Sequence, residues 1–204
     1  MSERHISVIM AAMTTPKDQI ITLPNPHLRQ PSRKVGIVTD EIKSLINNME
    51  VSTLDWEDSR DHEVGVALAA VQIDNMYRVV VIRSNFDDKN DRSFQVFINP
   101  EITKLEGEQI EDFEGCLSIK DIYGKVKRYS KVKVKALDIN GREFRVTAEG
   151  FLARVFQHEI DHTKGKVFID HIKDNPEAFY KLNAQGKLEA LDYDKDIKDN
   201  RLLW

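Results

Sequence analysis

Hydrophobic and polar residues alternate in the middle of the chain in the way that half-buried strands require. Residues 132–136 place apolar side chains between lysines, and residues 144–148 alternate again on the far side of Asn140-Gly141. Because Asn-Gly favours a two-residue hairpin turn, this stretch predicts a β-hairpin. Runs rich in valine and isoleucine at 78–82 and 95–98 predict two further strands.

Other segments have the spacing of a helix. Residues 40–49 begin with an aspartate that can cap a helix, and their apolar side chains follow at i, i+3, i+4 and i+7. Residues 151–164 have a similar period, and Gly165 is placed to end that helix. A last helix is predicted to start with Asn175 as its cap and Pro176 in its first turn, and to continue through the leucines up to residue 191.

Composition then limits the kind of protein. The chain has 204 residues, of which 41% are hydrophobic and 31% charged, as in globular proteins. One domain is expected over residues 19–191, between a flexible amino-terminal extension (1–18) and a charged carboxy-terminal tail (192–204). The net charge of -4 argues against a nucleic-acid partner, because proteins that bind nucleic acids usually carry an excess of basic residues. The apolar runs at 66–71 and 79–82 are too short to span a membrane.

The strongest chemical signal is the sequence His158-Glu159-Ile160-Asp161-His162. Histidines at positions i and i+4 project from one side of a helix and can bind one metal ion. Glu159 follows the first histidine, where a carboxylate can take a proton from water at the metal. Phe151 and Val155 share the face of the histidines, so both imidazoles are expected to point into the core.

A catalytic metal needs a third protein ligand. The candidates are Asp170, His171 and Glu177 downstream, and Cys116 upstream. Cys116 is the single cysteine, which excludes an internal disulfide and suits a reducing cytoplasm. Two alternatives stay open for it: a small buried thiol, or a nucleophile that lacks a nearby base. Gln72 ends a close-packed apolar run, where its amide could stabilise an oxyanion.

Three of these segments together resemble the peptide deformylase family. The family motifs Gly-x-Gly-Leu-Ala-Ala-x-Gln, Glu-Gly-Cys-Leu-Ser and Gln-His-Glu-x-Asp-His correspond, in order, to residues 65–72, 114–118 and 157–162. Weaker similarity extends over about residues 20–172. The resemblance implies an α+β fold, with antiparallel β-sheets packed around a central metal-bearing helix and a C-terminal helix. It also implies that residues 19–191 are a single catalytic domain.

The resemblance also implies roles for individual residues. The metal ligands of the family correspond to Cys116, His158 and His162. Glu159 corresponds to the general acid/base, and Gln72 to the side chain that donates to the substrate oxygen together with the backbone N–H of Leu117. The implied cofactor is one divalent metal ion, Fe(II) in first place, with Zn(II) or Ni(II) as alternatives.

The implied reaction removes the N-formyl group from the formylmethionine of a nascent polypeptide and releases formate. It would take place in the cytoplasm, with a transient ribosome contact and no direct contact with nucleic acid or membrane. The residues expected to bind the substrate and its methionine side chain are Gly65, Val66, Ala67, Phe151 and Val155.

Several positions depart from the family pattern, among them Lys120 and Lys127 in the loop after the cysteine, where many members have proline, and two positions near the pocket. Ala67 stands where the family has its second glycine, so its methyl group could crowd the substrate, or strain the backbone if φ is positive there. Arg154 brings a charge into the turn that forms the pocket, and it is expected at the rim.

Two other functions are weighed against a deformylase. An ordinary zinc metallopeptidase also carries His-Glu-x-x-His, but commonly takes its third ligand from downstream. A relative that binds metal and peptide without catalysis is suggested by Ala67. The retention of Glu159 argues against that second alternative.

Overall fold

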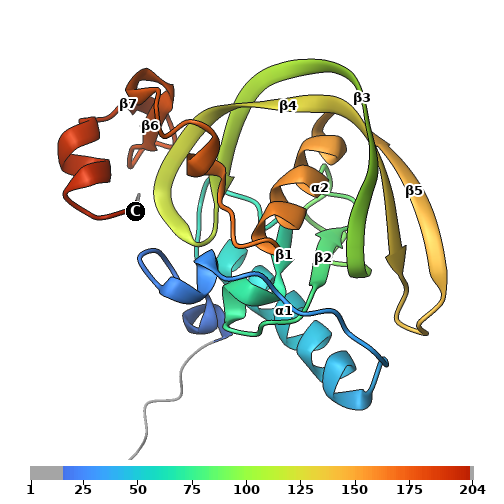
Figure 1. Ribbon diagram of the computed structural model, residues 1–204. Helices are drawn as coiled ribbons and strands as arrows, with labels where there is room; N and C mark the ends of the chain where they lie inside the picture. The colour runs from blue at the N-terminus through green and yellow to red at the C-terminus, as the bar shows by residue number, and fades with distance from the viewer. Residues whose placement is uncertain (1–15, 203–204) are drawn as a thin grey trace, which may run out of the picture.

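The structure is a computed structural model that describes residues 16–202. Its strands form one antiparallel sheet in the order β1-β2-β3-β4-β6-β7, and β5 also pairs with β4. The strands are β1 (Ala67–Ala69), β2 (Val79–Arg83), β3 (Phe94–Cys116), β4 (Ile119–Leu137), β5 (Glu143–Glu149), β6 (Phe179–Leu182) and β7 (Leu188–Ala190). The long strands β3 and β4 arch over a central helix (Figure 1). The predicted α+β fold with antiparallel strands around a central helix is confirmed.

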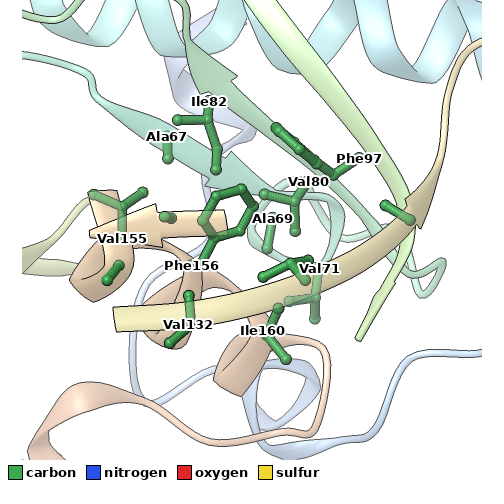
Figure 2. Packing of buried hydrophobic residues seen from close by; sticks show 14 residues of the cluster. Ala67, Ala69, Val71, Val80, Ile82, Phe97, Val132, Val155, Phe156 and Ile160 are labelled. Atoms are coloured by element: carbon green, nitrogen blue, oxygen red, sulfur yellow. The ribbon is translucent and has the colours of Figure 1, made fainter. Parts of the chain in front are cut away.

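The helices α1 (Asp40–Asp58) and α2 (Gly150–His162) pack on opposite faces of β1 and β2. Side chains alternate between the two faces of a strand, and β2 uses both. Val80 packs in the same buried cluster as Phe156 of α2, as Figure 2 shows. Val81 packs with Met49 of α1 instead. The helix that carries the two histidines is therefore enclosed by the sheet, while α1 supports the sheet from behind.

Both helices agree with the predicted spacing. Thr39, and not the predicted Asp40, caps α1 through its hydroxyl, which accepts from the backbone N–H of Ile42, and the helix continues through Asp58. It is longer than the predicted range of 40–49 and ends at Asp58. Gly165, with φ of +73°, follows the end of α2 as expected.

The predicted hairpin at 132–148 is confirmed as β4 and β5, but its turn is not the predicted two-residue turn. Leu137 pairs with Glu143, so five residues separate the paired positions. Asp138 organises this loop, because its carboxylate accepts from the backbone N–H groups of Asn140 and Arg142. Gly141 then adopts φ of +76°, as in a three-residue turn that ends in a left-handed glycine.

The helix predicted from residue 175 to residue 191 is wrong. A single 3-10 turn at Pro176–Ala178 leads into β6 and β7, which pair with each other. The side chain of Asn183 closes their turn by accepting from the backbone N–H groups of Gln185 and Lys187, and Gly186 has φ of +72°. The C-terminal helix is a shorter element, a π-helix at Asp194–Lys198.

The two predicted tails lie partly outside the described residues. Residues 1–15 of the amino-terminal extension are not described, and Pro16–Gln19 forms a 3-10 helix tied to α1 through Lys17 N–H and Asp55. In the carboxy-terminal segment, Ile197 is buried against the core. No helix in the described part of the chain is long and apolar enough to cross a membrane.

Candidate active site

The two histidines of α2 lie on its buried face, as their spacing predicts. His162 is fully buried and His158 nearly so, and their ring centroids are 5.0 Å apart. α2 packs against β4, β1 and β5, so its apolar stripe holds the histidines inside the molecule.

Cys116 reaches the histidines from the last position of β3. It pairs with Ile119 at the start of β4, so the chain reverses there and holds the thiol beside the helix. Its Sγ is 3.3 Å from Nε2 of His162. One ligand atom each from Cys116, His158 and His162 lie within 4.8 Å of one another, and these three form the candidate metal group found among residues 16–202.

The downstream candidates for the third ligand are engaged elsewhere. Asp170 pairs with Arg29, and its carboxylate also accepts from the backbone N–H of Val167. His171 pairs with Asp161 at 2.8 Å. Glu177 is exposed in the 3-10 turn before β6. The structure thus selects the upstream cysteine, and one thiolate with two imidazoles is a donor set that suits Fe(II), Zn(II) or Ni(II).

Glu114 fixes the orientation of His158. Its Oε2 lies 3.0 Å from Nδ1 of His158, which leaves Nε2 of that ring as the nitrogen that can bind a metal. Its Oε1 accepts from Nε of Arg128 and Nη1 of Arg154, both at 2.8 Å. Burial alone would raise the pKa of Glu114, but hydrogen bonds from His158 and Arg128 hold it well below its usual value. The group is therefore a carboxylate.

Arg154 is not at the rim of the pocket as predicted. Its side chain is 7% exposed and reaches away from solvent to Glu114. It also donates to the backbone carbonyl oxygens of Ile110 and Val126, at 2.7 Å each. A guanidinium has enough donors to bind all three acceptors, so the charge is satisfied inside the fold.

Glu159 is buried beside the metal group without a partner for one of its oxygens. Its Oε2 accepts no hydrogen bond from the described residues. Nδ1 of His162 likewise has no hydrogen-bond partner among them. Burial raises the pKa of Glu159 to about 7, partly offset by the nearby His158. A carboxyl that exchanges its proton near neutral pH suits a general acid/base.

Gln72 is held in a single orientation next to the cysteine. Its Oε1 accepts from the backbone N–H of Ala69 at 2.9 Å. Its Nε2 donates to Oγ of Ser118 at 3.1 Å and lies 3.5 Å from Sγ of Cys116. The amide N–H groups therefore face the metal group, and Leu117 lies at the same place in the pocket wall.

A pocket of about 310 Å³ opens beside these residues. Four of the five residues expected to bind the substrate line it, namely Val66, Ala67, Phe151 and Val155. Gly65 does not line it, since its N–H donates to Glu57 and its Cα packs against Thr53.

One part of the pocket wall had no recognisable signal in the sequence. This part is aromatic and polar and comes from separate segments: Trp56, His62, Glu63, Phe113 and Tyr123. Tyr123 donates its hydroxyl to Glu63 at 2.8 Å. Its ring fills the space beside Gly115, where an added Cβ would lie 2.6 Å from Cε1 of the tyrosine. This close approach explains the glycine before Cys116.

Comparisons with known proteins point to one family. A family profile described as polypeptide deformylase matches residues 17–177. Peptide deformylase 1 of Clostridium perfringens is 44% identical over 144 residues, which cover 71% of this chain and 90% of that protein. Peptide deformylase 1 of Pseudomonas syringae pv. tomato is 40% identical over 174 residues, or 84% of this chain and 97% of that protein.

Solved structures agree with the sequence comparisons. The peptide deformylase of Legionella pneumophila superposes with a TM-score of 0.66 at 41% identity, over 74% of this chain and 83% of that one. The Synechococcus elongatus peptide deformylase in complex with actinonin gives a TM-score of 0.68 at 35% identity, over 76% of this chain and 80% of that one. With a cysteine and two histidines gathered beneath its sheet, this chain belongs to the polypeptide deformylase family.

Proposed function

We propose that this chain carries out the reaction of its family, removal of the formyl group from an N-terminal methionine, at the group formed by Cys116, His158 and His162. The observation that carries the proposal is the convergence of these ligands within 4.8 Å, beside the buried carboxyl of Glu159. A divalent metal held there supplies a Lewis acid for the formyl carbonyl and lowers the pKa of a water molecule.

The residues around the metal group divide the remaining chemistry. Glu159 accepts the proton of the attacking water and later donates it to the amine of the leaving methionine. As charge develops on the formyl oxygen, Nε2 of Gln72 and the backbone N–H of Leu117 donate hydrogen bonds to it. The hydrogen bond that Nε2 of Gln72 donates to Oγ of Ser118 holds the amide ready for this role. The products are formate and a free amino terminus.

The methionine side chain occupies the apolar part of the pocket. Val66, Ala67 and Val155 form its inner wall, and Phe151 stands at the mouth with 48% of its surface exposed. Gly65 supports this wall from behind through its hydrogen bond to Glu57. An unbranched thioether adapts well to a pocket with such mixed walls.

The test is formate release from formyl-Met-Ala-Ser by protein purified without oxygen and loaded with Fe(II). Replacement of Glu159 by Gln keeps the shape of the side chain but removes the base, so we expect a loss of about 10²-fold or more in kcat with unchanged metal content. Release by Glu159→Gln at the wild-type rate would refute the role of Glu159. No release by wild-type protein with one metal bound per chain would refute the proposed function.

The identity of the metal is a separate part of the proposal. We expect Fe(II) in the cell, because the family resemblance places it first, and Zn(II) or Ni(II) as ions that also bind the thiolate and imidazoles. Metal analysis of protein purified without oxygen, together with activity per bound ion, tests this order. Cys116→Ala should remove most of the bound metal; unchanged metal content in that variant would show that the thiol is not a ligand.

We further infer a cytoplasmic reaction on chains that emerge from the ribosome. A thiolate ligand needs a compartment that keeps cysteines reduced. The substrate is the amino terminus of a new chain, so a transient ribosome contact would shorten the search for it. Co-sedimentation with ribosomes that carry formylated chains tests the contact, with empty ribosomes as the comparison.

A further inference from the structure

The hairpin of β6 and β7 lies outside the segment that matches the family. That match ends at residue 177, and the hairpin covers residues 179–190. It joins the sheet through β4, where Tyr180 pairs with Tyr123. In Figure 1 these two short strands, in orange and red, extend the sheet beyond the bend of β4. The sheet therefore gains two strands at the edge next to the pocket.

One face of this hairpin continues the wall of the pocket. In antiparallel strands, residues that lie directly opposite each other have side chains on the same face. Gly115 of β3, Tyr123 of β4 and Tyr180 of β6 form such a row, and Ala190 of β7 extends it. Tyr123 and Gly115 line the pocket. Tyr180 and Ala190 therefore present their side chains on the pocket side of the sheet.

The hairpin also touches the pocket wall at two places. The rings of Tyr180 and Phe113 meet edge to face, with centroids 5.0 Å apart, and Nζ of Lys125 lies 5.3 Å from each ring. At its turn, Gly186 packs against the imidazole of His62, where an added Cβ would lie 2.8 Å from Cγ. Phe113 and His62 both line the pocket. The hairpin surface and the pocket are thus continuous.

We propose that the face of β6 and β7 that carries Tyr180 and Ala190 is a subsite for the residues that follow the formylmethionine. This inference rests on the proposed function. Only the formylated end of a polypeptide reaches Cys116 and Glu159, so the rest of the substrate must leave through the open side of the pocket. The half-buried ring of Tyr180 offers a surface for apolar side chains at that point.

The first test compares a short substrate with a long one. For Tyr180→Ala, we expect KM to rise about five-fold for a formylated pentapeptide with apolar residues after methionine, with kcat unchanged. KM for formyl-methionine amide should not change, because that substrate ends before the hairpin. Tyr180→Phe should restore the wild-type KM since it keeps the ring. The matched control is Lys181→Ala, which lies on the same strand but on the opposite face.

Two results would overturn the subsite. One is an equal rise in KM for both substrates, which would show that Tyr180 only supports Phe113. The other is unchanged kinetics for Tyr180→Ala. If wild-type protein releases formate from neither substrate, the proposed function itself has failed, so the two failures are distinguishable. Metal content and thermal unfolding of each variant show whether it has folded.

A second variant avoids any loss of packing. Ala190 is exposed, so Ala190→Glu adds a carboxylate to the face without removing a buried contact. We expect kcat/KM to shift by about two-fold or more towards peptides with lysine after the second residue and away from those with glutamate, and the shift should shrink at high salt. An unchanged lysine-to-glutamate ratio would contradict the placement of the peptide on this face.

Discussion

At the scale of single residues, Glu114 joins three other side chains of the site through one carboxylate. Two guanidinium groups and the imidazole of His158 bind its oxygens, so Arg128 and Arg154 share one buried anionic partner, and Arg128 also pairs with Asp161. A buried network of ion pairs of this kind stabilises the fold only while every partner is present, because the loss of one partner leaves a buried charge unpaired. The metal ligand His158 therefore depends on residues from β3, β4 and α2 at once.

Replacement of Glu114 by Gln should destabilise the metal-free protein by about 3 kcal/mol at pH 7, because two buried guanidinium groups lose the carboxylate that they share and Arg128 keeps only Asp161. The folded protein holds the pKa of Glu114 below its usual value of 4.5, so this stabilisation is complete above pH 4.5 and is lost as the pH falls below it. Urea unfolding measures the free energy of unfolding of wild type and variant at pH 7 and at pH 4. The difference between the two proteins should be smaller at pH 4 than at pH 7.

The control for this prediction is Glu106→Gln. Glu106 also has a lowered pKa, through the hydrogen bond that Lys104 donates to it, but its side chain is partly exposed and both of its lysine partners lie at the surface. The stability of that variant should follow the wild type closely at both pH values. A loss as large as that of Glu114→Gln would mean that burial of the ion pairs is not the cause.

Ala67 provides a second test at this scale. It lies in β1 and is not among the described residues with positive φ, so alanine causes no backbone strain there. Ala67→Gly should therefore leave kcat and KM within about two-fold of wild type and lower stability by about 0.5–1 kcal/mol. A large drop in KM for formyl-Met-Ala-Ser would instead show that the methyl group crowds the substrate.

At the scale of elements, the sequence predicted those whose cause is local. The spacing of apolar residues and histidines is sufficient for α2, and alternation is sufficient for β4 and β5. The hairpin of β6 and β7 was missed because Phe179 and Leu182, three positions apart, also suit a helical spacing. Its strands exist because β6 pairs with β4, and that contact is distant in the sequence.

In the candidate site, too, the residues with a local sequence signal were predicted and those that depend on distant contacts were not. Its metal ligands and Glu159 carry recognisable motifs, whereas the roles of Arg128 and Arg154 depend on tertiary contacts with Glu114. No local sequence pattern predicts that two arginines from different elements bind the same carboxylate. The aromatic wall was missed for the same reason, since Trp56 and Tyr123 meet only in the folded chain.

The turn between β4 and β5 offers a test of element-scale geometry. Gly141 has φ of +76°, and an added Cβ would meet only a side-chain carbon of Val38 at 3.8 Å. Gly141→Ala should therefore cost about 1 kcal/mol through its backbone conformation alone. The matched control is Gly36→Ala, where an added Cβ meets nothing within 4 Å and φ is not in the left-handed region. Equal melting temperatures for the two variants would contradict this explanation.

At the scale of the whole molecule, the metal group connects the sheet to the helix inside it. Cys116 lies on β3 and His162 on α2, 46 positions apart. A ligand that binds only the folded state stabilises that state, by about 2.7 kcal/mol at a hundred-fold excess over its dissociation constant. Metal binding should therefore raise the free energy of unfolding of the whole fold and not only of the residues around the ion.

Removal of the metal by a chelator should lower the melting temperature, and Fe(II) or Zn(II) should restore it. His162→Ala is the control, since it should melt at one temperature whether or not metal is present. Calorimetry without oxygen measures both proteins. An equal response to metal in the variant and in the wild type would place the stabilising ion somewhere other than the group of Cys116, His158 and His162.

The origin of the ligands in two elements has a consequence for how the protein folds. Neither an isolated α2 nor an isolated β3 contains the full ligand set, so secondary structure alone cannot create the site. A compact intermediate with formed helices and strands but loose packing would lack it. Recovery of metal binding during refolding therefore reports the moment when the helix docks into the sheet, a step that circular dichroism in the far ultraviolet does not see.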